Sequence, residues 1–380
     1  MTETMHPACG RAWIELDAGA LHQNLKWFRK RAQNKQIIPV LKANAYGYGA
    51  GEILEILKDT DTQMIACACT EEAVFFRTHG WTGDILILGG TFASDMALLE
   101  KYHLTQALVD PSYAEMLEES GVRCDVHIAV DTGMHRIGFD PEDVSSIEAV
   151  FASGRLRVTG MFTHLCASDR KENRDFTMKQ ICRMNALTEC LRTCGYDPGL
   201  VHISATYGIV NYPDIQEDGA RLGIGMFGVL NNEEDCRKYR RVLHPVLSLH
   251  ARIASVRKLR AGEYAGYAMA YQAEKDSTIA VISIGYGDGL PRDFSEHGAY
   301  VLVRGKKARL IGRICTDQAL IDVTGIGALP NDMVTLIGRD EKEEITVGMW
   351  AEWEDTITID VLTRLSGRPQ RIIKTAAGVN

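Results

Sequence analysis

The stretch PVLKANAYGYG, residues 39–49, places a lysine at the end of an apolar run and follows it with a glycine-rich segment. The run at 37–41 has the length and composition of a short buried strand. Lys42 comes directly after it, and Gly47 and Gly49 allow a tight turn and a close approach of backbone to a ligand. A partly desolvated lysine at such a strand end is neutral often enough to attack a carbonyl group. Most single lysines are surface residues, so the role of Lys42 depends on the rest of the chain.

Apolar strand-like runs recur after Lys42, and amphipathic helical stretches separate them. The runs lie at 64–69, 85–89, 107–109, 126–130, 157–162, 200–203 and 224–227. Together with the run at 37–41 they make eight βα units, which predicts a TIM-type (β/α)8 barrel. Two helix starts carry capping signals: Asp17 is the predicted N-cap of the first helix, and Asp140-Pro141 are the cap and first residue of a later one.

The βα rhythm stops near His244, and the chain beyond it has strand-like alternation separated by turn residues. Strands are expected at 247–257, 278–284, 300–303, 308–311, 319–323 and 333–336, with one helix near 356–365. The predicted fold class is α/β, with a (β/α)8 TIM-type barrel over residues 14–245 followed by a mainly β domain over 246–380. Residues 11–16 are expected to form an edge strand, which makes residues 1–13 a candidate addition to the second domain.

The composition is that of an ordinary globular protein, and it restricts the partners and the location. The chain has 380 residues, 46% of them hydrophobic, and a net charge of −8, which disfavours nucleic acid and anionic membrane as the main partner. No run of about 18 apolar residues could span a bilayer, and the first residues lack the basic and apolar segments of a secretory signal. We therefore expect a cytoplasmic protein.

The ten cysteines do not have the spacing of a metal site or of a disulfide framework, and no CxxC occurs. Cys67 and Cys69 lie in an apolar run, where they behave as small strand residues. Cys182, Cys190 and Cys194 fall in a helical stretch. We expect free, buried thiols in a reducing compartment, and no metal.

Chemically reactive side chains gather at the ends of the predicted barrel strands. DTGMHRIG at 131–138 follows the fifth run, Thr163-His164 end the sixth, HISATYG at 202–208 ends the seventh, and RLGIG at 221–225 leads into the eighth. One histidine on an apolar strand is usually a core residue with its hydrogen bonds satisfied. Since the catalytic residues of TIM barrels lie at the C-terminal ends of the strands, the whole set, with Lys42, indicates an active site at that rim.

The second predicted domain adds GYAMAY at 266–271, GYGDG at 285–289 and GRICTDQ at 312–318. By themselves these segments are typical of hairpin turns with ordinary strand tyrosines. Taken with KANAYGYG and DTGMHRIG, they resemble the motifs of alanine racemase and of the related serine racemase domain over nearly the whole chain. The resemblance implies an enzyme that depends on pyridoxal phosphate (PLP).

The resemblance assigns cofactor roles to residues of the predicted barrel. It implies that Lys42 bonds covalently to PLP, that His164 lies near the cofactor ring, and that Arg221 faces the pyridine nitrogen. The remaining cofactor contacts are made with the phosphate group, and the resemblance gives them to Tyr46, the Thr206 hydroxyl and the backbone N–H groups of Gly223 and Ile224.

Substrate and partner roles are implied in the same way. Arg136 would approach the cofactor phenol oxygen and the substrate carboxylate, and the backbone of Thr316 would contact the same carboxylate. Tyr267 would be the second catalytic base, contributed by the partner subunit of a homodimer with composite active sites. The polar entrance of the family's site corresponds to Asp169, Arg292 and Arg313.

Racemisation of an amino acid needs an acid or base on each face of Cα, and Lys42 and Tyr267 would supply them. Tyrosine has a reference pKa of about 10, so a phenolate at Tyr267 needs support, which a chain through His164 to Arg221 could give. Arg221 would also keep its own proton. It would therefore leave the pyridine nitrogen unprotonated, which is how the family is thought to suppress transamination.

Four positions differ from the family's pattern. Ala129 stands where many members carry a carbamylated lysine that orients the arginine, Thr206 replaces a serine, and Thr316 replaces a methionine. The family's C-terminal tyrosine, which contacts the phosphate and narrows the pocket, is missing, because no tyrosine follows Tyr300. The matching region, residues 365–368, contains serine and glycine instead, and this difference bears on the size of the substrate.

We therefore predict an alanine racemase that supplies D-alanine for cell-wall peptides. A serine or broad-specificity amino-acid racemase is the alternative, favoured by Thr316 and by the missing tyrosine. A PLP-binding protein of cofactor homeostasis is a different class of alternative, which the predicted β domain disfavours. A decarboxylase of the same general architecture is disfavoured by the KANAYGYG and DTGMHRIG segments.

Overall fold

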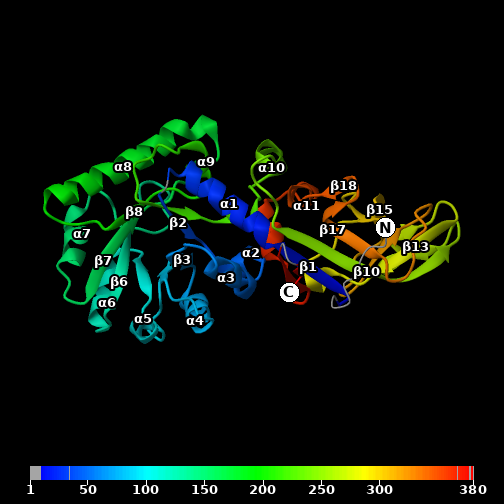
Figure 1. Ribbon diagram of the computed structural model, residues 1–380, viewed down its shortest axis with the longest axis horizontal. Coiled ribbons are helices and arrows are strands. Elements are labelled where there is room, and N and C mark those ends of the chain that lie inside the picture. The colour runs from blue at the N-terminus through cyan, green and yellow to red at the C-terminus, as the bar shows by residue number, and fades with distance from the viewer. Residues whose placement is uncertain (1–9, 34, 366, 376–377, 380) are drawn as a thin grey trace. The chain divides into compact units, whose positions relative to one another are not determined.

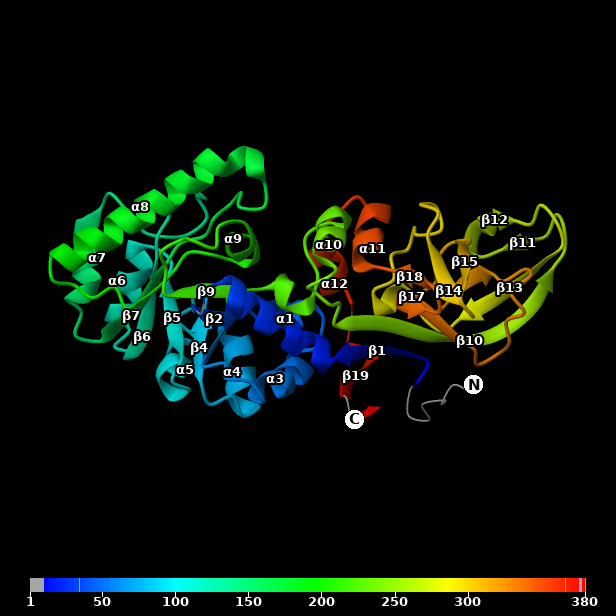
Figure 2. The ribbon, with the colours of Figure 1, turned by 45° about the horizontal axis from the view of Figure 1, so that its top comes forward.

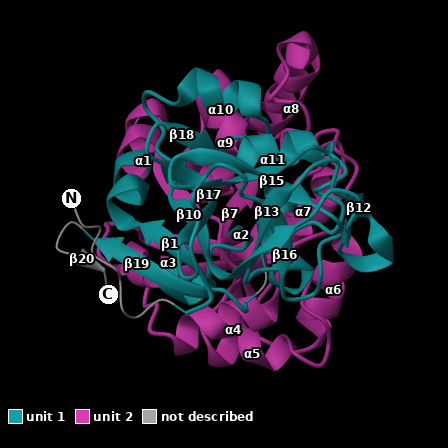
Figure 3. Cartoon of the chain, turned by 90° about the vertical axis from the view of Figure 1, so that its right-hand side faces the viewer, with its two compact units in different colours: residues 1–24, 46–52, 227–380 teal, residues 25–45, 53–226 magenta. Residues whose placement is uncertain are grey.

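The computed structural model describes residues 10–33, 35–365, 367–375 and 378–379. The chain divides into two compact units, shown in different colours in Figure 3. One unit contains residues 25–45 and 53–226, and the other contains residues 1–24, 46–52 and 227–380. Neither unit is continuous in sequence, so the boundary expected near residue 245 stays a prediction.

The unit of residues 25–45 and 53–226 is built on an eight-stranded parallel sheet, and we call it the barrel unit (Figures 1 and 2). The strand order is β2-β9-β8-β7-β6-β5-β4-β3. A parallel bridge between Val40 and Ala66 brings β2 beside β3, so the sheet nearly closes on itself, which confirms the predicted barrel. The strands are β2 (Gln36–Pro39), β3 (Met64–Cys67), β4 (Asp84–Ile87), β5 (Thr105–Leu108), β6 (Cys124–Ala129), β7 (Leu156–Phe162), β8 (Leu200–His202) and β9 (Gly219–Leu222).

Helices alternate with these strands along the chain, as the βα rhythm predicts, and α4 to α8 lie outside the strands (Figure 2). The helical segments are α1 (Ala18–Arg31), α2 (Lys42–Tyr46), α3 (Ala50–Lys58), α4 (Thr70–Thr78), α5 (Met96–Lys101), α6 (Pro111–Glu119), α7 (Val144–Phe151), α8 (Arg174–Thr193) and α9 (Thr206–Asn211), with a 3-10 turn, η1 (Lys171–Asn173), before α8.

The two predicted helix caps have different outcomes. Asp17 does cap α1, because its carboxylate accepts the Ala20 N–H over 2.9 Å. The start predicted at Asp140 is wrong: α7 begins later, and its cap is Asp143, whose carboxylate accepts the Ser146 N–H. Both aspartates are good capping residues, so the sequence alone does not show which of them begins the helix.

The last barrel strand is not the predicted run at 224–227. It is β9, while residues 224–227 form a short 3-10 helix, η2 (Ile224–Phe227). Both segments are buried, and an apolar run reports burial without distinguishing a strand from a buried turn. Arg221 interrupts the apolar pattern of β9, which hides the strand from this kind of pattern search. The arginine therefore lies within the last strand and not ahead of it.

The unit of residues 1–24, 46–52 and 227–380 is mainly β, as predicted, and we call it the β unit. Its ten-stranded sheet has the order β18-β17-β14-β15-β16-β13-β10-β1-β19-β20, and β17 also pairs with β10. The strands are β1 (Ala12–Asp17), β10 (Leu247–Leu259), β13 (Ser277–Ile282), β14 (Tyr300–Val303), β15 (Lys306–Ile311), β16 (Ala319–Asp322), β17 (Met333–Asp340), β18 (Glu343–Ile345), β19 (Gln370–Thr375) and β20 (Gly378–Val379).

Smaller elements complete the β unit. A separate hairpin pairs β11 (Tyr264–Ala265) with β12 (Tyr271–Gln272), in agreement with the expectation that Tyr264 and Tyr271 are ordinary strand residues. The helices are α10 (Glu233–Tyr239), α11 (Val347–Trp353) and α12 (Thr358–Thr363). The last of them matches the helix predicted near 356–365, while α11 was not predicted.

β1 is a strand, as predicted, but it is not an edge strand. It pairs antiparallel with β10 and parallel with β19, so that Trp13 lies between His250 and Gln370. Ile14 and Leu16 are fully buried. Alternation of apolar and polar residues predicts a strand without identifying its neighbours, and here both neighbours come from distant parts of the sequence.

A buried carboxylate, Asp288, organises the GYGDG segment that the sequence presents as a turn. The segment forms η4 (Tyr286–Asp288), and Gly289 after it has a φ of 106°. Asp288 is fully buried, and its carboxylate accepts from both terminal nitrogens of Arg11 over 2.6 and 3.0 Å. It also accepts the Gly285 N–H over 3.0 Å. Arg11 thus ties the start of the described chain to a loop far away in sequence.

Three expectations about composition can be compared with the structure. Within the described residues, no helix is long and apolar enough to cross a membrane. In the same part of the chain, no group of three or more His, Cys, Asp or Glu residues is placed to bind a metal ion. The nine described cysteines are free, but the expectation that they are buried is wrong for Cys166, Cys182, Cys190 and Cys194, which are exposed.

We predict that Asp288→Asn destabilises the protein. The amide keeps the shape of the carboxylate but loses the charged hydrogen bonds with Arg11, so the free energy of unfolding should fall by about 1.5–3 kcal/mol. Urea denaturation at neutral pH measures this change. The matched control is Asp293→Asn, which removes an exposed carboxylate 3.4 Å from His297 and should change the free energy by about 0.5 kcal/mol at most. Equal effects of the two variants would contradict the role given to Asp288.

Candidate active site

Lys42 lies at the C-terminal end of β2 and begins a left-handed turn. Ala43, Asn44 and Ala45 have φ and ψ angles between 46° and 55°, which is the left-handed helical region. Each non-glycine residue in that region costs roughly 1–2 kcal/mol, so the three together cost about 3–6 kcal/mol. Strained backbone of this kind persists where surrounding contacts enforce it, and it often occurs at functional sites.

Hydrogen bonds within the barrel unit hold the turn in this conformation. The Ala43 N–H donates to Glu72 Oε1 over 2.6 Å, and the Ala68 N–H donates to Oε2 of the same carboxylate over 2.8 Å. The Ala45 N–H donates to Leu41 O over 3.0 Å. The turn therefore closes on Leu41, which follows β2, and Glu72 anchors it to the segment after β3.

The environment of Lys42 lowers the pKa of its amine. Partial burial lowers the pKa of Lys42, and the positive charge of Arg136 lowers it further, while the negative charge of Glu72 acts in the opposite direction. Burial disfavours a charged ammonium, so Lys42 loses its proton more readily than a surface lysine does.

Arg221 is buried inside the barrel, and its two terminal nitrogens donate to the ends of neighbouring strands. Nη1 donates to His202 Nδ1 over 2.6 Å and to His202 O over 2.9 Å. Nη2 donates to Thr163 O over 2.6 Å, to Ile203 O over 3.1 Å and to His164 Nδ1 over 3.3 Å. Among the described residues, the Nε–H of Arg221 makes no hydrogen bond, so this is the donor that remains for a ligand.

Arg221 also determines which nitrogen of each neighbouring histidine carries the proton. Arginine can only donate, so Nδ1 of both His164 and His202 must accept, and in the neutral rings the proton lies on Nε2. Burial and the charge of Arg221 lower the pKa of His164 to about 3 and lower the pKa of His202 in the same direction. Both imidazoles are therefore neutral at physiological pH, and His164 presents an Nε2–H donor.

A further histidine extends this network into the barrel interior. His127 Nδ1 lies 2.8 Å from His202 Nε2, so it accepts a hydrogen bond from the Nε2–H of His202. Nε2 of His127 is buried without a hydrogen-bond partner in the described part of the chain. The ring is accommodated by Gly160, where a Cβ would lie 2.6 Å from it. Sequence reasoning gave no role to His127, and its place on an apolar strand was the only signal.

The predicted phosphate contacts of the barrel unit come from the segments after β8 and β9. Thr206 is buried and begins α9, and its hydroxyl accepts the Gly225 N–H over 3.4 Å. Gly223 directly follows β9, and Ile224 begins η2. A Cβ at Gly225 would lie 2.5 Å from the Phe28 ring and 2.7 Å from the Thr206 methyl group, so this close packing needs glycine. Free backbone N–H groups at a helix start favour an anion.

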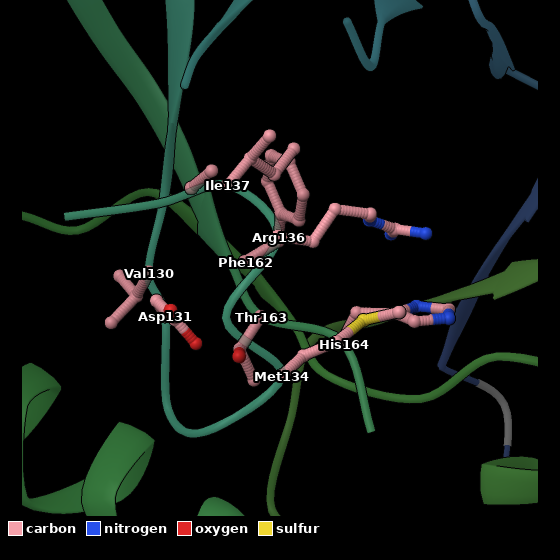
Figure 4. A pocket seen from close by; sticks show the side chains of 9 residues that line it. Val130, Asp131, Met134, Arg136, Ile137, Phe162, Thr163 and His164 are labelled. Atoms are coloured by element: carbon pink, nitrogen blue, oxygen red, sulfur yellow. The ribbon is translucent and has the colours of Figure 1, made fainter. Parts of the chain in front are cut away.

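Arg136 and His164 line a hollow that is partly open to solvent and is bounded by residues between 129 and 137 and by residues 162–164 (Figure 4). In Figure 4 the two side chains extend toward the same side. Asp131 shapes the loop before Arg136, because its carboxylate accepts the N–H groups of Gly133 and His135 over 2.9 and 3.0 Å. Ala129 lies in the wall of the hollow. No hydrogen bond or ion pair with a described residue holds the Arg136 guanidinium.

The other predicted site residues belong to the β unit. Tyr267 lies in η3 (Tyr267–Met269), with 67% of its surface exposed. The backbone around it is strained, since Ala268 and Met269 have φ angles of 57° and 50°. Thr316 is exposed and donates its hydroxyl to the Tyr286 phenol oxygen over 2.5 Å. The roles given to Tyr267 and Thr316 stay predictions.

Tyr46 also belongs to the β unit, where its ring packs edge-on against Phe227, with 6.2 Å between the ring centroids. Gly47 after it is packed so closely that a Cβ would lie 1.9 Å from Leu362 O. Arg371 donates to Gly47 O over 2.6 Å. These contacts fix the glycine-rich segment, and the assignment of Tyr46 to the phosphate stays a prediction.

The chain matches both domains of one enzyme family. The model for "Alanine racemase, N-terminal domain" matches residues 16–231, and the model for "Alanine racemase, C-terminal domain" matches residues 246–373. Most of the chain is covered by the two together.

Curated relatives have racemase names. An amino-acid racemase of Enterococcus faecalis is 37% identical over 94% of this chain and 51% of its own length. An alanine racemase of Clostridium perfringens is 36% identical over 95% of each chain. A serine/alanine racemase of Enterococcus gallinarum is 33% identical over 96% of this chain and 52% of its own length. The chain thus spans about half the length of the first and the third of these relatives.

Solved structures of racemases have the same fold. An alanine racemase of Clostridium difficile superposes with a TM-score of 0.90 at 28% identity and covers 98% of this chain and 97% of its own. A histidine racemase of Leuconostoc mesenteroides superposes with a TM-score of 0.87 at 30% identity and covers 97% and 99% of the two chains. Since the sequence and the fold agree over nearly the whole length, the chain belongs to the alanine racemase family.

Proposed function

We propose that this protein is a PLP-dependent amino-acid racemase that interconverts L- and D-alanine with Lys42 and Tyr267 as its two bases. The observation that carries the proposal is the pairing of a partly desolvated lysine at a strand end with a buried Arg221 whose Nε–H is left for a ligand. The alanine racemase family is PLP-dependent. Supply of D-alanine for cell-wall peptides, a cytoplasmic location and a homodimer are parts of the same proposal.

The residues of the barrel unit fit PLP. Lys42 offers an amine of lowered pKa for the cofactor aldehyde. The Thr206 hydroxyl and the backbone N–H groups of Gly223 and Ile224 would bind the phosphate, together with Tyr46 of the β unit. The Nε–H of Arg221 would face the pyridine nitrogen. When it is bound, PLP supplies the electron sink that makes the Cα proton of an amino acid acidic.

The two proposed bases act on opposite faces of Cα. Lys42 Nζ takes the proton from one face or returns it there, which its lowered pKa favours. In this proposal the Tyr267 phenol oxygen acts on the other face, and the partner subunit of the homodimer contributes it. Arg136 binds the substrate carboxylate, and the backbone of Thr316 contacts it too.

The tautomer of His164 supports the role of Tyr267. Because His164 Nδ1 accepts from Arg221, its Nε2–H is available as a donor, and a donor stabilises a phenolate. Because the His164 ring is neutral, it carries no positive charge that could stabilise the phenolate of Tyr267. The stabilisation is limited to this hydrogen bond and to the charge of Arg221, which donates to the same ring. Arg221 keeps its proton, since burial lowers its pKa only to about 10. The pyridine nitrogen would therefore stay unprotonated, which disfavours transamination.

A serine or broad-specificity racemase is the second candidate function. No tyrosine follows Tyr300, and the hydroxyl of Thr316 is bonded to Tyr286, so the wall expected to contact the substrate differs from the family's pattern. The serine/alanine racemase and the histidine racemase among the relatives support a variable substrate in this fold. A PLP-binding protein without catalysis is disfavoured, because residues 246–373 match the second racemase domain.

We predict that the purified protein is yellow and that borohydride reduction fixes PLP on Lys42. The lowered pKa of Lys42 makes its amine more reactive than that of an ordinary surface lysine. Peptide mapping by mass spectrometry measures the position of the label. Lys35→Ala is the matched control, since Lys35 lies in the same unit but is 3.7 Å from the Glu217 carboxylate, and this variant should be labelled on Lys42 like the wild type. A label found on another lysine would refute the assignment.

We predict that a Lys42→Ala chain and a Tyr267→Phe chain, each inactive alone, regain activity when they are mixed. A heterodimer has one composite site with both bases intact, so recovery should reach about a quarter of the wild-type rate under random subunit exchange. The control is Tyr264→Phe, which alters an exposed tyrosine in β11 and should be active without mixing. No recovery after verified exchange would mean that the two residues act within one chain.

The third prediction from this site concerns the substrate. In heavy water the protein should racemise L-alanine with incorporation of deuterium at Cα, and serine should be turned over with a kcat/KM within about a hundredfold of that of alanine, because one extra group in a pocket is worth only about 1–3 kcal/mol. Loss of optical activity and mass spectrometry measure both reactions, and Lys42→Ala is the blank. If the kcat/KM for alanine exceeds that for serine by more than about a thousandfold, the pocket is not broadened. If no amino acid is turned over, the proposed racemase activity is refuted.

A further inference from the structure

Glu72, which has no part in the proposed chemistry, bridges two backbone segments beside Lys42. It lies in the first turn of α4. Its Oε1 accepts the N–H of Ala43, the residue directly after Lys42, over 2.6 Å, and its Oε2 accepts the N–H of Ala68 over 2.8 Å. One carboxylate thus joins the segment after β2 to the segment after β3 through two hydrogen bonds to backbone N–H groups.

Through the first of these hydrogen bonds, Glu72 can affect the orientation of the Lys42 side chain. Ala43 is the first residue of the left-handed turn, and its N–H belongs to the peptide unit that links it to Lys42. If that peptide unit rotated toward a relaxed conformation, the direction in which the Lys42 side chain leaves the strand would change. Hydrogen bonds that a carboxylate accepts from backbone N–H groups are roughly twice as strong as neutral ones. Glu72 is therefore well placed to keep the turn from relaxing.

Glu72 also contributes to the electrostatic environment of the amine. The charged and titratable groups that act on Lys42 come from three parts of the barrel unit: Arg136 from the loop after β6, His164 from the end of β7, and Glu72 from α4. His164 is neutral, so the two charges that oppose each other are Arg136 and Glu72. The positive charge lowers the pKa of Lys42, and the negative charge raises it.

We propose that Glu72 is a positioning residue for Lys42: its carboxylate fixes the left-handed turn that orients the lysine, and its negative charge offsets that of Arg136 at the amine. The proposal rests on the function given to Lys42 above. Glu72 acts through backbone and through charge, and it touches neither substrate nor cofactor.

Three variants separate the two effects. Glu72→Gln keeps the length of the side chain but removes its charge and turns one acceptor into a donor. Glu72→Asp keeps the charge but is one methylene shorter, so it cannot reach both N–H groups. Glu71→Gln is the matched control, because Glu71 is the neighbouring exposed carboxylate in the same turn of α4 and makes the same change to the charge at the helix start.

The first readout is the reactivity of Lys42 in the apo protein. Labelling by trinitrobenzenesulfonate, followed at Lys42 by mass spectrometry across a pH series, reports the fraction of neutral amine. Loss of the negative charge favours the neutral amine, so the midpoint for Glu72→Gln should move to lower pH. The midpoint should not change in Glu71→Gln. In Glu72→Asp it should lie closer to the wild-type midpoint than in Glu72→Gln. A midpoint that is unchanged in folded Glu72→Gln would overturn the electrostatic part of the proposal.

The second readout is hydrogen exchange at the two amides. Exchange at Ala43 and Ala68 should be at least about tenfold faster in both Glu72 variants, the effect of losing a hydrogen bond to a charged group, and unchanged in Glu71→Gln. If Glu72→Gln does not fold, Glu72→Asp decides, because the shortened side chain should also leave the two amides less protected from exchange. Unaltered exchange at Ala43 and Ala68 in a folded Glu72 variant would overturn the positioning role.

Activity of the holoenzyme provides the third readout. The kcat/KM for alanine should fall by about ten- to a hundredfold in Glu72→Gln, which corresponds to one lost charged hydrogen bond, and should be unchanged in Glu71→Gln. Failure of the proposed function is distinguishable from failure of this inference. If Lys42 were not the catalytic lysine, activity would survive in Glu72→Gln while the labelling midpoint and the amide exchange still changed.

Discussion

The candidate site depends on one buried cation, Arg221, and on the backbone oxygens that surround it. The guanidinium donates to carbonyl groups at the ends of β7 and β8, those of Thr163, His202 and Ile203, so a side chain of β9 joins three neighbouring strands at their C-terminal ends. A buried charge without partners would be strongly unfavourable. Here neutral acceptors bind its two terminal nitrogens, and the same hydrogen bonds fix the geometry of these strand ends.

This arrangement sets the chemistry of the histidines as well as their positions. Because arginine only donates, the hydrogen bonds run outward from Arg221, through His202 to His127 on one side and to His164 on the other. Burial lowers the pKa of His127 to about 4 and that of His164 to about 3, so neither ring is a proton reservoir near neutral pH. The proton transfers of the proposed reaction therefore fall to Lys42 and Tyr267, and the histidines orient.

The sequence predicted the elements whose pattern is local and missed the contacts between distant segments. Apolar strand runs that end in a residue with a reactive side chain were recognisable from the sequence, and so was the helix cap at Asp17. The strand that contains Arg221 was missed because its charge is buried by acceptors from other strands, which no local pattern reveals. Glu72 and the pair of Arg11 with Asp288 were missed for the same reason: each appears as a surface charge until a partner distant in sequence is placed beside it.

The charges of the barrel unit also indicate what kind of ligand the site favours. Lys42, Arg136 and Arg221 are close enough for Arg136 to lower the pKa of both the lysine and the buried arginine. Glu72 acts in the opposite direction on the pKa of Lys42, and Glu217 does so on the pKa of Arg221. The cations therefore destabilise one another in the free protein. A ligand with a phosphate and a carboxylate relieves that repulsion, so its binding is favoured before any specific hydrogen bond is counted. The same repulsion makes Lys42 readier to lose its proton, which links ligand affinity to the reactivity of the lysine.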